Sequence, residues 1–242
     1  MEDEANILEV KGLKVYFPIK KGVFARTVGY VKAVDGVSFN VRRAETLGVV
    51  GESGSGKSTI ARVISGLQKA TDGGFALSGK VSMIFQDPQG SLNPRQSVRA
   101  TLSEILKHVG SKKTPLELLE AVGLDSSHLD KYPHEFSGGQ RQRICIARAI
   151  ALESELLICD EAVSALDLSI RSQILDLLMD LKKRFNLSLM FITHDLGVVK
   201  HIADRVIVMK SGKIVECSSC NEIITNPQHD YTKKLISSVL SL

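Results

Sequence analysis

A glycine-rich turn near the start of the chain limits most strongly what the chain can fold into. An apolar run at residues 46–50 precedes the turn, and apolar residues at helical spacing follow it at residues 59–67. Glycines let successive backbone N–H groups point at one anion, and the positive end of the following helix favours the same negative charge. The turn reads Gly51, Glu52, Ser53, Gly54, Ser55, Gly56, Lys57, Ser58 and Thr59. We therefore expect a phosphate-binding loop, with Lys57 at the β- and γ-phosphates and the Ser58 hydroxyl on Mg²⁺.

The rest of the chain alternates between short apolar runs and stretches with helical spacing. Runs at residues 7–10, 13–17, 31–34 and 37–41 predict short antiparallel strands. Runs at 81–85, 156–160 and 187–193 predict buried strands, while 97–109, 115–122, 141–152 and 170–181 show helical spacing. Strands that alternate with helices indicate a mostly parallel sheet covered on both faces, which binds ligands at the carboxyl ends of its strands.

Acidic and imidazole side chains stand where two of the buried runs end. Asp160 closes the run at 156–160, Glu161 follows it, and His194 follows the run at 187–193. Adjacent carboxylates repel each other, so their presence is better explained if one binds a metal ion and the other polarises a water molecule. We expect Asp160 to hold Mg²⁺ and Glu161 to orient and deprotonate the water, with a capping role for Glu161 as the alternative. A histidine at a strand end is more often structural, but beside these elements His194 is expected at the γ-phosphate.

The composition excludes several classes of protein. The chain has 242 residues and a net charge of +4, from 31 basic and 27 acidic side chains. This balance excludes intrinsic disorder and does not indicate a dedicated nucleic-acid binder. No apolar run approaches the ~18 residues of a membrane-spanning helix, and the first residues are acidic where a signal peptide is basic. We expect a cytosolic chain that reaches a membrane only through a partner.

Two features of the sequence each allow two interpretations. The densest basic stretch, at residues 11–43, is either a solvated face or a surface for an anion. Cys217 and Cys220 have metal-ligand spacing, but one pair supplies only two ligands, so incidental cysteines are favoured over a metal or redox pair. Cys145 and Cys159 fall within apolar patterns and are expected in the core.

The residues upstream of Asp160 resemble the signature motif of ABC ATPases. They are Phe136, Ser137, Gly138, Gly139 and Gln140, followed by Arg141, Gln142 and Arg143. Further motifs of that family are matched in order. Gln86 resembles the Q-loop glutamine, Ser164, Ala165, Leu166 and Asp167 resemble the D-loop, His194 resembles the H-loop histidine, and Tyr16 resembles the aromatic residue that stacks on adenine, with Phe17 less favoured.

The resemblance covers essentially the whole chain and implies a fold. That fold is α/β, of the P-loop NTPase type, with a RecA-like, mostly parallel sheet, an N-terminal antiparallel β region and an inserted helical subdomain. Within a single domain at 1–242, it implies a nucleotide-binding core at 1–86 and 152–225, a helical subdomain at about 87–151 and a C-terminal helical tail at 226–242.

The same resemblance implies an ATPase with ATP and Mg²⁺ as cofactors. Glu161, His194 and Gln86 would be catalytic, and Gln86 would join Ser58 and Asp160 around the metal. Two subunits would hold two ATP molecules head to tail, with an identical or paralogous partner. Residues Ser137, Gly138, Gly139 and Gln140 would bind the ATP on the partner's phosphate loop, because a hydroxyl and helix-start amides form an anion site. The D-loop at 164–167 would lie in the dimer contact.

Two further stretches indicate which branch of the family the chain resembles. Residues 85–95 and 226–235 are similar to the ATPases of peptide and nickel importers. We expect a peripheral subunit at the cytoplasmic face of the membrane that powers uptake of peptides or nickel through integral permease subunits, served by an extracytoplasmic binding protein, without nucleic acid. The alternative is a non-transport ABC ATPase acting on DNA or ribosomes, which usually has a coiled-coil insertion or a second cassette. A P-loop GTPase or kinase would leave the signature residues unexplained.

Three departures from the branch are visible. Only 29 positions separate Lys57 from Gln86, so the antiparallel region after the first helix is expected to be abbreviated. Ala162 replaces the usual proline after the catalytic glutamate, which weakly favours nickel. Cys217 and Cys220 stand where relatives have a glycine-containing turn; relatives with an iron–sulfur cluster have further cysteines in a longer C-terminal extension, so no cluster is expected.

Overall fold

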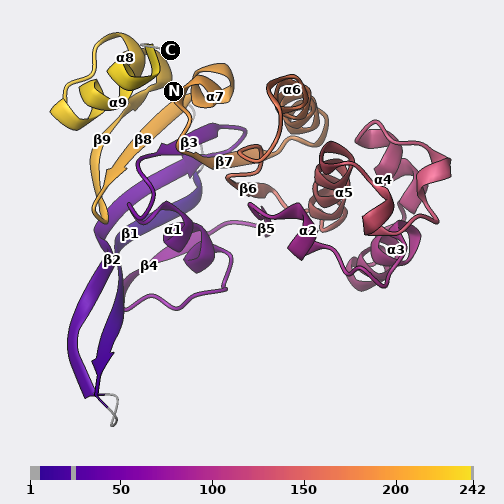
Figure 1. Ribbon diagram of the computed structural model, residues 1–242, viewed down its shortest axis with the longest axis horizontal. Helices are drawn as coiled ribbons and strands as arrows, with labels where there is room; N and C mark the ends of the chain where they lie inside the picture. The colour runs from indigo at the N-terminus through magenta and orange to yellow at the C-terminus, as the bar shows by residue number, and fades with distance from the viewer. Residues whose placement is uncertain (1–5, 23–25, 241–242) are drawn as a thin grey trace. The chain divides into compact units, whose positions relative to one another are not determined.

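The computed structural model describes residues 6–22 and 26–240 (Figure 1). The chain divides into two compact units. Unit 1 comprises Met1–Ser78 and Met190–Leu242, and unit 2 comprises Gly79–Leu189. Among the described residues, no helix is both long and apolar enough to span a bilayer. The predicted subdomain limits at 86/87 and 151/152 stay a prediction.

An antiparallel sheet opens unit 1. Its strands are β1 (Asn6–Lys21), β2 (Arg26–Arg42) and β4 (Asp72–Leu77), in the order β2-β1-β4. The expected antiparallel pairing is confirmed, but the expected four short strands are wrong, because β1 and β2 each run through an irregularity. Gly12 and Gly36 adopt φ of 56° and 78°, and the register shifts between Val10 and Leu13. A bulge absorbs extra residues without ending the strand, which the period-two pattern cannot reveal.

Parallel pairing characterises the second group of strands in unit 1. β3 (Thr46–Val50) pairs in parallel with β8 (Arg205–Lys210), and β9 (Lys213–Ser219) pairs antiparallel with β8. β7 (Ser188–Thr193), which begins in unit 2, neighbours β3. All residues of β3 and β7 are buried, as expected of strands covered on both faces. Neither β8 nor β9 is among the predicted strands.

Four helices complete unit 1. They are α1 (Lys57–Ile64), α7 (Leu196–Ile202), α8 (Cys220–Thr225) and α9 (Asp230–Leu240). A core cluster joins β3 and β8 to three of them through Val50, Val208, Val199, Ile223 and Ile236. Helix α9 lies within the predicted C-terminal helical tail and is anchored to the strand core by this cluster.

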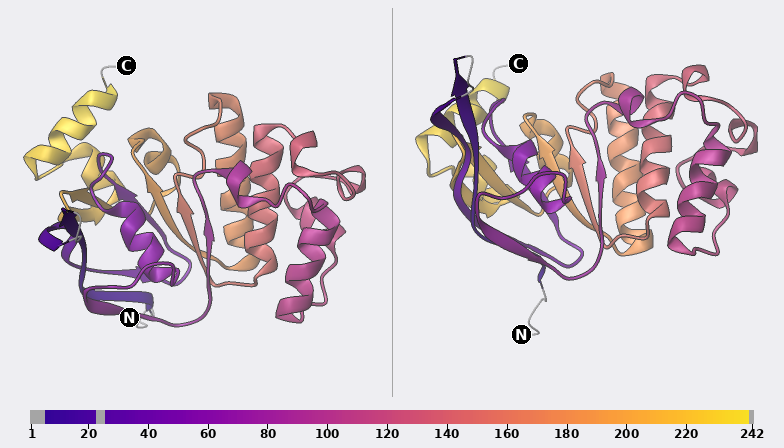
Figure 2. Two further views of the ribbon diagram at one scale, coloured as in Figure 1. Left: turned by 60° about the horizontal axis from the view of Figure 1, so that its bottom comes forward. Right: turned by 90° about the horizontal axis from the view of Figure 1, so that it is seen from below.

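Unit 2 is mainly helical. β5 (Val81–Ile84) pairs in parallel with β6 (Leu156–Asp160). Between them lie α2 (Pro88–Ser91), α3 (Val98–Val109), α4 (Pro115–Ala121) and α5 (Gly138–Ala151), and α6 (Leu168–Phe185) follows β6. Figures 1 and 2 both show α5 beside α6. Local signals set the helix ends: Ser97 caps α3, and Thr114 and Glu117 form a capping box at α4.

Candidate functional site

The phosphate loop in unit 1 requires glycine at two positions. Gly51 and Gly56 have φ of 153° and 105°. A Cβ on Gly51 would lie 2.2 Å from the Met209 carbonyl oxygen, and one on Gly56 would lie 2.3 Å from the Ala33 carbonyl oxygen. Gly56 also occupies the N-cap of α1, where no described side chain caps the helix. Helix starts without a side-chain cap suit anions, and binding of phosphate at this turn stays a prediction.

The Lys57 side chain folds back into the loop. It is only 4% exposed, and its Nζ donates to the carbonyl oxygens of Gly51 and Glu52 at 2.7 and 2.8 Å and to Ser55 Oγ at 3.3 Å. A buried ammonium group is tolerated only where acceptors surround it. The loop therefore holds a positive charge at its centre, among the amides that are expected to bind phosphate.

The C-terminal segment supports the loop, which the sequence did not predict. Tyr231 of α9 is 5% exposed, and its hydroxyl accepts the backbone N–H of Glu52 at 3.0 Å. Glu216 of β9 accepts the backbone N–H groups of Gln228 and His229 at 2.8 and 3.0 Å, which fixes the entry into α9. The only sequence signal was the apolar spacing of the tail, which does not identify its target.

Tyr16 lies beside the end of the phosphate loop. It pairs with Lys32 across the β1–β2 ladder, next to Ala33, the residue whose carbonyl faces Gly56. Its hydroxyl donates to the Asp35 carboxylate, and this bond lowers the pKa of Asp35 and raises that of Tyr16. Lys32 Nζ lies 5.3 Å from the centre of the ring. These contacts fix the position of the Tyr16 ring, and its stacking on adenine stays a prediction.

His194 directly follows β7, the neighbour of β3, and is exposed. The phosphate loop directly follows β3. The next residue, Asp195, caps α7 by accepting from the N–H groups of Gly197 and Val198 at 2.8 and 3.4 Å. This cap fixes the backbone at the end of β7 and leaves the His194 ring at the surface.

In unit 2 the structure brings Gln86 and Glu161 together. Ile84 pairs with Cys159 in the parallel β5–β6 register, so the residues two positions farther on leave the two strands side by side. Gln86 Nε2 donates to Glu161 Oε2 at 3.0 Å. The two predicted catalytic residues of this unit are therefore in direct contact.

Asp160 and the segment after it are tightly held. Asp160 is 6% exposed at the end of β6. The Glu161 carbonyl oxygen accepts from the Ser164 backbone N–H at 3.1 Å and from Ser164 Oγ at 2.9 Å. These bonds close a turn that starts the predicted D-loop, whose residues Ala165 and Asp167 are exposed.

The signature residues begin helix α5. Ser137 is its N-cap, and its Oγ accepts the Gln140 backbone N–H at 3.3 Å while Gln140 Oε1 accepts the Ser137 N–H at 3.0 Å. Ser137 and Gly138 are exposed. A Cβ on Gly139 would lie 2.7 Å from Ile170 Cγ2 of α6. The helix start thus presents an exposed hydroxyl and glycine amides, the donor set predicted for an anion.

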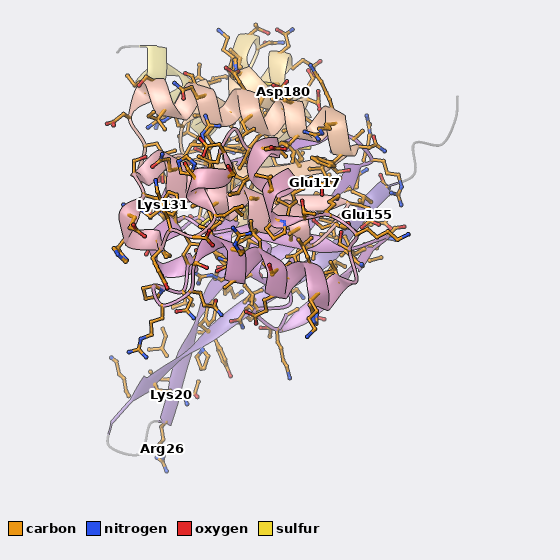
Figure 3. The ribbon with its side chains drawn as sticks, turned by 90° about the vertical axis from the view of Figure 1, so that its right-hand side faces the viewer. Lys20, Arg26, Glu117, Lys131, Glu155 and Asp180 are labelled. Carbon is orange, nitrogen blue, oxygen red and sulfur yellow. The ribbon has the colours of Figure 1, made fainter. Side chains whose placement is uncertain are left out.

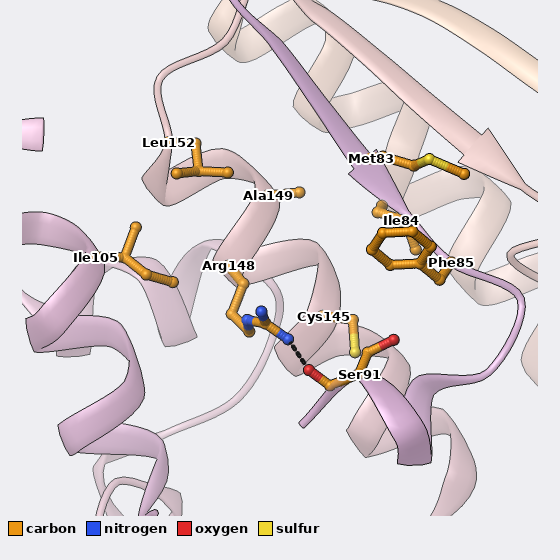
Figure 4. A pocket seen from close by; sticks show the side chains of 9 residues that line it. All are labelled: Met83, Ile84, Phe85, Ser91, Ile105, Cys145, Arg148, Ala149 and Leu152. Atoms are coloured by element: carbon orange, nitrogen blue, oxygen red, sulfur yellow. Dashed lines mark hydrogen bonds between the residues drawn. The ribbon is translucent and has the colours of Figure 1, made fainter. Parts of the chain in front are cut away.

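A small cavity of about 60 Å³ lies at the end of β5, and its lining includes Phe85, the residue before Gln86 in the chain (Figure 4). Arg148 donates to the Ser91 carbonyl oxygen in this cavity, and its buried Nε has no hydrogen-bond partner among the described residues. Burial raises the pKa of the Cys145 thiol there to about 11. The lining residues are Met83, Ile84, Phe85, Ser91, Ile105, Cys145, Arg148, Ala149 and Leu152.

The sequence pattern of the ABC transporter family matches residues 34–164, more than half of the chain. The chain belongs to the ABC transporter family. The predicted family and its ATPase class are therefore confirmed. The matched range of this ABC protein includes the phosphate loop, Gln86, the signature residues, Asp160 and Glu161.

Curated relatives of this ABC protein are named for peptide transport. The oligopeptide transport ATP-binding protein AppF of Bacillus subtilis is 47% identical over 262 residues, covering 98% of this chain and 79% of the relative. OppF of Escherichia coli is 49% identical and the dipeptide transport ATP-binding protein DppF of Haemophilus influenzae is 44% identical, each with 98% of this chain and 79% of the relative covered. Since the aligned lengths exceed 242 residues, the relatives carry residues that this chain lacks.

Solved structures confirm the predicted fold class. The ATP-binding cassette MJ0796, a dimer bound to ADP and phosphate in a post-hydrolysis state, has a TM-score of 0.74 at 24% identity, over 88% of this chain and 98% of that one. CbiO1 of Clostridium perfringens, part of the transporter complex cbiONQ, has a TM-score of 0.75 at 25% identity, over 98% and 95%.

Proposed function

We propose that the chain is the ATP-hydrolysing subunit of a peptide importer, which pairs head to tail with an identical or paralogous ATPase and docks on integral permease subunits at the cytoplasmic face of the membrane. The names of relatives at 43–49% identity favour oligopeptides or dipeptides as the cargo. Nickel is the second candidate, for which the weak indication is Ala162. An extracytoplasmic binding protein would deliver the cargo to the permease.

The residues of the phosphate loop fit a nucleotide triphosphate with Mg²⁺. Added Cβ atoms at Gly51 and Gly56 would collide with backbone, so the loop keeps the tight path that turns its amides inward. Lys57 already gathers three oxygen acceptors, which phosphate oxygens would replace. The Ser58 hydroxyl, the Asp160 carboxylate and the Gln86 amide oxygen are hard ligands of the kind that Mg²⁺ prefers. Bound Mg²⁺ would neutralise charge that develops on the phosphates.

The observation that carries the proposal is the contact between Gln86 and Glu161 at 3.0 Å. In this proposal Glu161 takes a proton from the attacking water, and the hydrogen bond from Gln86 orients its carboxylate. Gln86 also begins the segment that runs beside the cavity. Displacement of that segment would therefore break or re-form the hydrogen bond that orients the Glu161 carboxylate. His194 is proposed to contact the γ-phosphate.

The signature and D-loop residues support a pairing with a second ATPase. Ser137 and Gly138 are exposed at the start of α5, a helix of 14 residues. Leu168, directly after the D-loop, is 78% exposed. We propose that residues 137–140 bind the nucleotide on the partner's phosphate loop.

The cavity at the end of β5 is proposed as part of the docking surface for the permease. Phe85 is 42% exposed, and the cavity walls are mostly apolar around Arg148. An apolar side chain with a nearby carbonyl or carboxylate from the permease would fill the cavity and satisfy the Arg148 Nε.

The test of hydrolysis is Glu161→Gln in the complex with its permease. We expect phosphate release to fall by at least about 100-fold, the usual contribution of a general base, while binding of a fluorescent ATP analogue persists. The matched control is Glu120→Gln, because Glu120 is an exposed glutamate of α4 that belongs to none of the predicted motifs, and this variant should hydrolyse ATP normally. Brisk hydrolysis by Glu161→Gln would refute the assignment.

The cargo is tested by deleting the gene and scoring growth on peptides and on limiting nickel. Loss of growth on peptides that is restored by the wild-type gene supports the proposal. A growth defect confined to limiting nickel would show that the cargo is nickel and not a peptide. Purification with nucleic acid or ribosomes instead of membrane subunits would favour the non-transport alternative.

A further inference from the structure

The outer part of the β1–β2 hairpin exposes an unusual concentration of apolar side chains. Of the ten large hydrophobic side chains that are exposed among the described residues, five lie in residues 17–21 of β1 and 26–32 of β2, here called the outer ladder. Val15 and Val34, which pair farther along the same two strands beyond Tyr16 and Lys32, are 1% and 0% exposed. The five exposed side chains are Phe17, Ile19, Val28, Tyr30 and Val31.

Both faces of the outer ladder are apolar. Phe17 pairs with Val31, and the next pair, Pro18 with Tyr30, projects to the opposite face because side chains alternate along a strand. A folded protein surface would cover one face of such a two-stranded ribbon and leave the other in water. A lipid interface surrounds whatever enters it and would cover both.

The outer ladder ends in positive charge. Lys21 pairs with Arg26, next to Lys20, and all three side chains are exposed. None of the three forms an ion pair within the described part of the chain. The sequence has no acidic residue between Glu9 and Asp35. Figure 3 shows Lys20 and Arg26 near the end of the paired strands, with the Arg26 side chain extending beyond them.

We infer that the outer ladder binds the surface of an anionic phospholipid bilayer. The aromatic and aliphatic side chains enter the boundary between headgroups and acyl chains, and the basic side chains contact acidic headgroups. This inference gives a role to Lys20, Lys21 and Arg26 within the basic stretch at 11–43, whose role the sequence left open, and it goes beyond the proposed ATPase function.

The first test is co-sedimentation of the full chain, without nucleotide, with vesicles of phosphatidylglycerol and phosphatidylcholine. Each basic side chain near an anionic surface strengthens binding about fivefold, so the triple variant Lys20→Gln, Lys21→Gln, Arg26→Gln should bind about 100-fold more weakly. The matched control replaces Lys107, Lys183 and Arg184 by Gln, exposed basic residues of unit 2. Both variants lose three positive charges from the net charge of +4, so only the position differs.

A second test reports insertion directly and does not depend on the charge variants. The chain contains no tryptophan, so Tyr30→Trp supplies a single indole in the outer ladder. Its emission should shift to the blue when anionic vesicles are added, and the shift should vanish with pure phosphatidylcholine or at high salt. Tyr132→Trp, at a site in unit 2 that is 42% exposed, should not respond.

Three results would overturn the inference. They are equal loss of binding in both charge variants, no shift of the indole emission in the Tyr30→Trp variant, and a shift that requires the permease in the vesicles. The last result would assign the outer ladder to a protein partner. None involves ATP turnover, so failure here would leave the proposed hydrolysis untouched, and failure of the Glu161→Gln test would leave the lipid contact untouched.

Discussion

The backbone of Glu161 adopts a conformation that suits its proposed role. Its backbone has φ of 50°, a left-handed conformation that side chains other than glycine seldom adopt and that costs on the order of 1 kcal/mol. The Ser164 backbone N–H and hydroxyl both bind its carbonyl oxygen and hold this conformation. At this residue the chain leaves the line of strand β6, and the Glu161 carboxylate accepts the hydrogen bond from the Gln86 amide.

Tyr231→Phe tests whether the C-terminal helix supports the phosphate loop. The substitution removes the acceptor of the Glu52 backbone N–H and keeps the buried ring. We expect the free energy of unfolding to fall by about 1 kcal/mol and the affinity for ATP to decrease, because the loop loses one of its supports. Denaturant unfolding and nucleotide titration measure the two effects.

The control for this variant is Tyr30→Phe, since Tyr30 is 60% exposed. It should leave both quantities unchanged. Equal effects of the two substitutions would contradict the supporting role of Tyr231.

Helix α5 illustrates how an element serves packing and chemistry with the same residues. Its Ser137 cap fixes the helix start, while Gly139 allows Ile170 of α6 to approach. Since Ile170 is branched at Cβ, its Cγ2 cannot swing away freely. The glycines of the signature are therefore not equivalent: one serves the helix contact, and its neighbour faces solvent.

Gly139→Ala should destabilise the protein by about 1–3 kcal/mol, because its Cβ would overpack against Ile170. The matched variant Gly138→Ala places its Cβ 3.9 Å from Leu166 Cδ2, an ordinary contact, and should be neutral or slightly stabilising. Urea unfolding of both variants decides the matter. Equal stability of the two would show that α5 and α6 tolerate the added methyl group.

At the scale of the whole molecule, each of the two units contains two of the four cysteines. Cys145 and Cys159 lie in unit 2, and Cys217 and Cys220 lie in unit 1. Cys159 of β6 is fully buried and Cys145 of α5 is 7% exposed, as the sequence predicts for both. Cys217 and Cys220 make different contacts. Cys217 is exposed and accepts from Arg205 at 3.8 Å, while the buried Cys220 thiol contacts the Val199 carbonyl oxygen at 3.7 Å. The predicted absence of an iron–sulfur cluster stays a prediction.

Thiol labelling should separate these positions. Burial raises the pKa of Cys145 to about 11 and of Cys159 to about 12, so at pH 8 the thiolate fraction of either is about one in a thousand or less. Raising the pH increases both fractions, but the native packing still excludes the reagent. Mass spectrometry after a short maleimide pulse should find Cys217 labelled alone, with the others reacting in denaturant. Early labelling of Cys159 would show that β6 opens in the native state.

Much of the site could be predicted from local sequence. The glycine spacing at 51–56 requires a tight turn between a strand and a helix, and the structure shows backbone atoms that exclude a Cβ at Gly51 and Gly56. Helices α3, α4 and α5 follow from periodicity and caps that act within a few residues. Strand lengths were harder, since the bulges near Gly12 and Gly36 depend on the partner strand.

The sequence by itself determined the expected chemistry: a phosphate loop, carboxylates at a strand end and a signature motif at a helix start, each encoded over a few adjacent residues. Only the tertiary structure decided which residues hold that chemistry in place. The contacts of Glu52 with Tyr231, of Gln86 with Glu161 and of Gly139 with Ile170 join residues 179, 75 and 31 positions apart. Such contacts depend on strand register and helix packing, which are set by the burial of many side chains at once and leave no local pattern to read.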